Sequence, residues 1–149
     1  MYQTRSKSHR RGRNVAALML AAVLAVSAVA VPMALAKGSK TVVGEATAPS
    51  LHKTVLTNTK GLTLYSLSVE KNGKFICTGS CTHTWLPLVV AAGTTPKGPV
   101  KLGTIKRPEG KIQVTFKGLP LYTFDGDSTK GQAKGEGFKD VGTWHAVTP

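Results

Sequence analysis

The segment 111–127 constrains the fold more than any other part of this chain. It holds two short apolar runs, 112–116 and 119–124, separated by the pair Lys117-Gly118. The runs are rich in β-branched and aromatic residues, and a short connection ending in Gly is typical of a tight β-hairpin. Gly118 can adopt the positive φ that such a turn requires. The segment therefore predicts a hairpin, with Pro120 in an edge strand because its nitrogen carries no hydrogen.

A weaker copy of this segment lies 57 residues upstream. Residues 60–67 read Lys-Gly-Leu-Thr-Leu-Tyr-Ser-Leu, against Lys-Gly-Leu-Pro-Leu-Tyr-Thr-Phe in 117–124. A Trp follows the shared Tyr after 20 residues in the first copy and 22 in the second. We therefore predict two repeats, 51–92 and 100–149, each with a hairpin, a Tyr, a variable loop and a Trp that begins a short strand.

The rest of the pattern predicts an all-β protein. No part of 37–149 keeps a helical period of apolar residues over three turns. Each repeat has one face too apolar to be stable alone, so we expect the two to pack into one small sandwich or barrel-like domain over 51–149. The shared core would be built by the aromatic and aliphatic residues at matched positions, which we interpret as structural. These are Tyr65, Leu67, Trp85, Tyr122, Phe124 and Trp144.

The N-terminal segment has the organisation of a secretory signal peptide. Five basic residues in 1–13 precede an apolar run over 15–31, and small residues stand at Ala34 and Ala36. We predict cleavage after Ala36, a flexible lead-in over 37–50, and a secreted product without a stable membrane span. The alternative is an uncleaved anchor, because the apolar run approaches the length of a spanning helix.

The chain is strongly basic. It carries 20 Lys and Arg against 7 Asp and Glu, and five of the basic residues lie in 1–36, which leaves a formal charge of +8 after cleavage. This charge either solvates the surface or attracts a partner, which we expect to be an anionic cell-wall polymer or an envelope protein. Nucleic acid is not an expected partner, because the lysines are dispersed and the chain is exported.

A motif in the second repeat supports a family resemblance. Tyr122, Phe124 and Asp127 follow the pattern Tyr-x-(Phe/Trp/Tyr)-x-x-Asp, and Trp144-His145 stands downstream. The chain resembles, over about 51–149, the bacterial secreted repeat or lipoprotein family named for this motif, whose function is unknown. Many members are lipid-anchored, whereas this chain has no Cys near the predicted cleavage site, which implies a soluble or wall-held product. In the first repeat Leu67 and Glu70 replace the aromatic residue and the Asp.

Asp127 allows two interpretations. The carboxylate can accept hydrogen bonds from amides of the glycine-rich loop that follows, which is the structural role we expect. Glu70 should contribute less to stability, since it is longer and its motif is degraded. Alternatively, Asp125, Asp127, Thr129 and Glu136 fall at positions of a calcium loop, although Lys130 stands where that loop requires Gly.

Cys77 and Cys81 are the only cysteines. In an exported protein they predict a disulfide. The alternative is a redox or metal-handling protein in which Cys77, Cys81 and His83 bind copper or zinc.

Few residues suggest catalysis. The histidines after the signal peptide are His52, His83 and His145, and none stands in a recognisable nucleophile or acid–base motif. We expect a non-enzymatic binding or structural module of the cell envelope that uses no cofactor.

Overall fold

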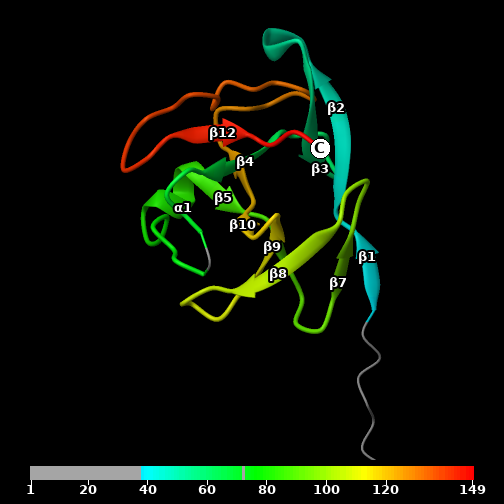
Figure 1. The fold of residues 1–149 in the computed structure, drawn as a ribbon, viewed down its shortest axis with the longest axis vertical. Helices are drawn as coiled ribbons and strands as arrows, with labels where there is room; N and C mark the ends of the chain where they lie inside the picture. Colours follow the sequence, from blue (N-terminus) through cyan, green and yellow to red (C-terminus); the bar gives the residue numbers. More distant parts are fainter. Residues whose placement is uncertain (1–37, 72) are drawn as a thin grey trace, which may run out of the picture. The chain divides into compact units, whose positions relative to one another are not determined.

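A computed structural model describes residues 38–71 and 73–149. The predicted signal peptide, 1–36, lies outside the described residues. The described residues form many short strands and one α-helical turn, which lies at one side (Figure 1). The elements are β1 Ser39–Thr41, β2 Val43–Ala48, the 3-10 turn η1 Pro49–Leu51, β3 Lys53–Asn58, β4 Leu64–Leu67, α1 Cys81–Thr84, β5 Trp85–Pro87, β6 Val89–Val90, β7 Thr95–Lys97, β8 Leu102–Lys106, β9 Ile112–Phe116, β10 Leu119–Pro120, β11 Tyr122–Phe124 and β12 Trp144–Ala146.

The prediction of an all-β fold is confirmed, and the described strands form several small sheets, none of which closes into a barrel. Two of the sheets have four strands: β12-β4-β11-β5, and β10-β9-β6 with β8 also paired to β9. The other two are the hairpin β2-β3 and the parallel pair β1-β7.

The hairpin predicted from 112–116 and 119–124 is confirmed at its turn, whereas residues 122–124 leave it and pair with β4 and β5 as β11. β9 and β10 pair antiparallel with Phe116 opposite Leu119, and the turn residues Lys117 and Gly118 have φ values of 50° and 80°. Two positive φ values in a two-residue connection are typical of the type I′ turn, which matches the twist of the strands. Pro120 lies in β10, at the end of its sheet, as expected for a residue without an amide hydrogen.

The expectation of a flexible lead-in over 37–50 was wrong. β2 pairs with β3 along its whole length, from Val43 opposite Asn58 to Ala48 opposite Lys53. Val43 and Ala48 are buried and anchor the two ends of the strand. The sequence Val-Gly-Glu-Ala-Thr-Ala contains mostly small residues, so its strand signal is weak, and pairing with β3 supplies the stabilisation.

This strand also changes the description of the first repeat. The strands β2, β3, β4 and β5 correspond in order to β8, β9, β11 and β12. The predicted first hairpin, 55–57 with 61–67, is correspondingly minor, since β3 and β4 meet at one bridge, Thr57–Thr63, while β3 pairs with β2. The turn between them is held by Asn58, whose Oδ1 accepts hydrogen bonds from the amides of Lys60 and Leu62.

The sheet β12-β4-β11-β5 separates two buried clusters. Alternate residues of a strand point to opposite faces, so Leu64 and Leu121 enter an aliphatic cluster, while Tyr65 and Tyr122 enter an aromatic one. The aromatic cluster consists of Tyr65, Leu67, Cys77, Trp85, Tyr122 and Trp144.

Candidate functional site

The two motif tyrosines lie directly opposite each other. Tyr65 in β4 pairs with Tyr122 in β11. On the outer sides, Trp144 of β12 is opposite Leu67, and Trp85 of β5 is opposite Phe124. The Trp-bearing strand of each repeat therefore pairs with the Tyr-bearing strand of the other repeat, so that neither repeat completes this sheet alone.

The aromatic rings pack both between and within the repeats, because the two tryptophans stack on each other while each tyrosine packs against the Trp of its own repeat. Trp85 and Trp144 stack with their centroids 3.8 Å apart and their planes at 6°. Tyr65 packs edge-on against Trp85 at 5.4 Å, and Tyr122 against Trp144 at 5.1 Å. All four residues are at most 1 % exposed. Their location supports the interpretation that they are core residues.

Phe124 is less buried than we expected for a core position. It packs at the edge of the aromatic cluster, 4.6 Å from Trp85 between ring centroids. Phe138, in the glycine-rich loop, packs on the same tryptophan at 5.9 Å, although 45 % of its surface is exposed. Sequence reasoning missed Phe138, because a lone aromatic residue among glycines carries no periodic signal.

The acidic residues of the two motifs are also exchanged between the repeats. The Tyr65 hydroxyl donates a 2.6 Å hydrogen bond to Oδ2 of Asp127, and the Tyr122 hydroxyl donates a 2.8 Å bond to Oε2 of Glu70. Asp127 Oδ1 also accepts the amide of Lys134 at 3.0 Å. We expected Asp127 to hold the following loop by accepting hydrogen bonds from its amides. It accepts one such amide, and it also accepts the hydroxyl of Tyr65.

The expectation that Glu70 contributes less than Asp127 does not fit this geometry. Glu70 is fully buried, and its Oε1 accepts the amides of Ile76 and Cys77, both at 2.7 Å. With Tyr122 it therefore has three donors. The longer side chain reaches amides of its own loop while still meeting the tyrosine of the other repeat.

A buried arginine that the sequence did not indicate completes this network. Arg107 is 2 % exposed and donates to the Tyr122 hydroxyl at 3.1 Å, to Gln113 Oε1 at 2.6 Å and to the Cys77 carbonyl at 2.8 Å. Its Nε donates to Glu109. A buried Arg is rare unless its donors are satisfied, and no alternation or motif marks this position, which lies in a turn between β8 and β9.

The environment shifts the pKa values of these groups. Burial, followed by the interaction with Asp127, raises the pKa of Tyr65. Burial and the neighbouring Glu70 raise the pKa of Tyr122, against the opposing effect of Arg107. Burial opposes the charge of Arg107, but its hydrogen bonds to Glu109 and Tyr122 outweigh that effect and raise its pKa, while the bond from Arg107 lowers the pKa of Glu109. Both phenols therefore stay protonated at neutral pH, as donors to the carboxyl groups.

The comparison with known families concerns the second repeat. Residues 103–148 match a secreted repeat of unknown function. The resemblance stated from the sequence is confirmed over this region, which runs from β8 to the end of β12, while the Tyr-x-(Phe/Trp/Tyr)-x-x-Asp motif itself is not tested by the match. No curated protein and no solved structure matches the chain.

The disulfide predicted in this secreted protein is present. Cys77 and Cys81 are bonded, with their Cα atoms 5.2 Å apart. The metal alternative loses its two thiolates to this bond, and among the described residues there is no cluster of three His, Cys, Asp or Glu side chains that could hold an ion. His83 is exposed in α1. The disulfide and the family description both fit a location outside the cytoplasm.

The calcium alternative also fails on geometry. Asp127 is bonded to Tyr65 and Lys134. Glu136 instead accepts the amide of Ala146 at 2.6 Å and lies 3.1 Å from Nδ1 of His145. Asp127 and Glu136 therefore have separate partners and do not converge on one site.

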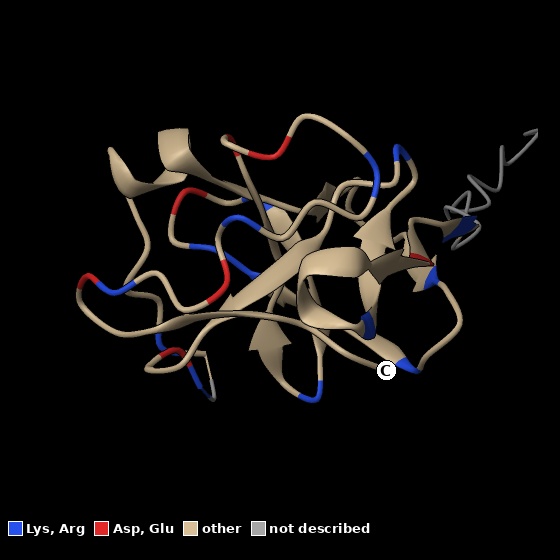
Figure 2. Ribbon diagram, turned by 90° about the horizontal axis from the view of Figure 1, so that it is seen from above, with Lys and Arg blue, Asp and Glu red and all other residues tan. Residues whose placement is uncertain are grey.

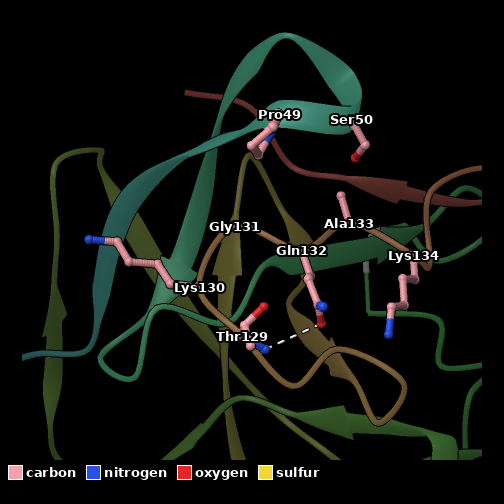
Figure 3. A pocket seen from close by; sticks show the side chains of 8 residues that line it. All are labelled: Pro49, Ser50, Thr129, Lys130, Gly131, Gln132, Ala133 and Lys134. Carbon is pink, nitrogen blue, oxygen red and sulfur yellow. Dashed lines mark hydrogen bonds between the residues drawn. The ribbon is translucent and has the colours of Figure 1, made fainter.

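One surface hollow lies beside the 3-10 turn η1, and the described residues around it include no acid–base group other than lysine. This hollow, of about 440 Å³, lies between the β2–β3 turn and the loop 129–134 (Figure 3). The side chains of Lys130 and Lys134 extend from it in different directions, and Gln132 Oε1 accepts the amide of Thr129. Its described lining holds two lysines but no carboxyl, imidazole or thiol group. In residues 38–71 and 73–149, no helix has the length and apolar character that crossing a membrane requires.

Proposed function

We propose that this secreted repeat is a non-enzymatic module that binds anionic polymers of the cell envelope. The observation that carries the proposal is the unequal distribution of charged side chains between interior and surface. Glu70, Asp127 and Arg107 are buried and bonded within the fold, together with both motif tyrosines. The motif is thus engaged in holding the two repeats together and offers no free reactive group.

On the surface, basic residues outnumber acidic ones. Thirteen lysines in the described residues are exposed, against five acidic residues. Figure 2 shows these basic positions distributed over turns and strand ends. Dispersed lysines on a stable scaffold attract an extended polyanion through many weak contacts, which are sensitive to salt.

Co-sedimentation with insoluble cell walls tests this function. The protein without residues 1–36 would be mixed with intact walls and with walls whose phosphodiester polymers have been extracted by acid. We expect binding to intact walls at low salt, release as salt is added, and little binding to extracted walls. Equal binding to both preparations, or no binding to either, would contradict the proposal.

A further inference from the structure

The two repeats present equivalent hollows beside their turn lysines. The first hollow, about 360 Å³, is lined by Thr41, Val43, Gly44, Glu45, Thr57, Asn58, Thr59, Lys60, Gly61 and Lys130. The second hollow, about 390 Å³, is lined by Lys101, Leu102, Gly103, Thr115, Phe116, Lys117 and Gly118. In each, a Gly of one strand faces a Thr of its partner, Gly44 opposite Thr57 and Gly103 opposite Thr115.

The glycines keep these hollows open. A Cβ atom added at Gly103 would lie 2.8 Å from Oγ1 of Thr115, and one added at Gly44 would lie 3.4 Å from Oγ1 of Thr57. The threonine hydroxyl therefore lies on the floor next to a position without a side chain. Thr115 is 7 % exposed, so most of its side chain is buried at the edge of the hollow.

The charges distinguish the two hollows. The first contains Glu45, whose carboxylate offsets Lys60 and Lys130. The described lining of the second includes two lysines, Lys101 and Lys117, and no acidic residue. Leu102 pairs with Phe116, so Lys101 lies just before β8 and Lys117 just after β9, and both are exposed and line the same hollow. Two ammonium groups without a counter-charge favour a bound anion.

We propose that the second hollow binds a phosphate group of a phosphodiester polymer. Two lysines and a threonine line this hollow, and their ammonium and hydroxyl groups can each donate a hydrogen bond to an oxygen of a phosphate group. A planar carboxylate is matched best by the fork of an Arg side chain, and the second hollow has none. Lys117 is also held in position, since its Nζ lies 4.5 Å from the centroid of the Phe116 ring. This inference rests on the proposed function and names the part of the surface that performs it.

Paired charge variants test the assignment. Affinity for poly(glycerol phosphate) would be measured for the wild type, for Lys101→Gln/Lys117→Gln, and for the matched control Lys60→Gln/Lys130→Gln in the first hollow. Both variants remove two exposed charges, so the net charge is the same. We expect the first to weaken binding by on the order of thirtyfold and the control by less than about threefold.

A subtler variant tests the hydroxyl. Thr115→Val keeps the shape of the side chain but removes the donor, and we expect affinity to fall about fivefold, against no change for Thr57→Val. Thermal melts of both variants confirm that the fold is retained. An unchanged affinity in folded Thr115→Val would remove the hydroxyl from the site.

The outcomes separate this inference from the proposed function. If the wild type binds the polymer and both lysine variants weaken it equally, binding is spread over the surface and the site assignment is wrong. If no polymer binds at all, the proposed function fails as well. If vesicles of phosphatidylglycerol and phosphatidylcholine in equal parts bind as tightly through Lys101 and Lys117, the anion is a lipid headgroup, and the polymer assignment is overturned.

Discussion

The two repeats solve the same structural problem with different acids. In the second repeat Asp127 reaches Tyr65 and one amide of its loop, whereas in the first Glu70 reaches Tyr122 and two amides. Both carboxyl groups bond to the tyrosine of the other repeat. The feature common to both repeats is therefore the hydrogen bond between a tyrosine and the carboxyl group of the other repeat. The acids differ in length because each also accepts amides of a different loop.

The loops themselves differ in how they are constrained. The loop after Glu70 is closed by the Cys77–Cys81 disulfide and contacts Arg107 through the Cys77 carbonyl. The loop after Asp127 is glycine-rich and has no disulfide. A small domain can thus reinforce one of two equivalent loops by a covalent bond and the other by backbone turns and hydrogen bonds.

The largest expected effect comes from the stacked tryptophans. Trp85→Ala and Trp144→Ala should each lower the free energy of unfolding by about 3–5 kcal/mol, because both rings are fully buried. The loss in the double variant should be smaller than the sum, since the two rings stack on each other. Urea denaturation of the three variants measures this. Strictly additive losses would show that the stack does not couple the repeats.

The next comparison concerns the two acids. Glu70→Ala should cost about 3–5 kcal/mol, as expected for removing one member of a buried charged network, because it leaves three donors unpaired beside Arg107. Asp127→Ala should cost about 1–3 kcal/mol, because fewer donors lose their partner. Chemical denaturation ranks the two variants. A larger loss for Asp127→Ala would restore the view that the first motif is degraded.

Some features of the fold could be predicted from the residues next to them. The turn at Lys117-Gly118 and the disulfide follow from local chemistry, because a positive-φ turn and two nearby cysteines each have few structural solutions. Replacement of Asp by Glu in the first motif suggested a weaker interaction, because the sequence shows the type of residue and not the distance to its partner.

Long-range partners explain the remaining differences. β2 has little intrinsic strand preference and forms because β3 lies beside it. Arg107 lies in a turn, where a charged residue is normally solvated, and is buried because residues from three separate segments bond to it. Neither the pairing of β2 nor the burial of Arg107 can be predicted from the residues next to them in the sequence.

The disulfide should have a moderate effect. Replacement of both cysteines by Ala should lower the free energy of unfolding by roughly 2 kcal/mol. This is the low end of the range for disulfides, because the two cysteines are only four positions apart in the sequence and the bond closes a short loop. Thiol reagent added to the unreduced, denatured wild type should label no cysteine. Labelling of both would contradict the bond and restore the redox or metal alternative. The loop after Asp127 in the second repeat serves as the control, since its resistance to proteolysis should be the same in the double Ala variant as in the wild type.

The smallest effect near neutral pH, which grows in alkali, concerns the two tyrosines. The pKa of each phenol is raised in the folded protein from an ordinary value of 10.0. Above that pH the unfolded chain loses protons that the folded chain retains, so the stability from these groups is fully present below pH 10 and falls as the pH rises further. Each phenol contributes a decrease of about 1.4 kcal/mol per pH unit.

Absorbance at the phenolate band should therefore rise only together with unfolding, which circular dichroism follows. The predicted mature chain, 37–149, contains Tyr65 and Tyr122 as its only tyrosines, so there is no freely titrating phenol to obscure the result. Tyr65→Phe and Tyr122→Phe should each reduce the amplitude by half and leave one phenol that ionises on unfolding. If one phenol ionises in the folded protein near pH 10, its repeat lacks the buried tyrosine–carboxyl pair, and the equivalence of the two repeats is lost.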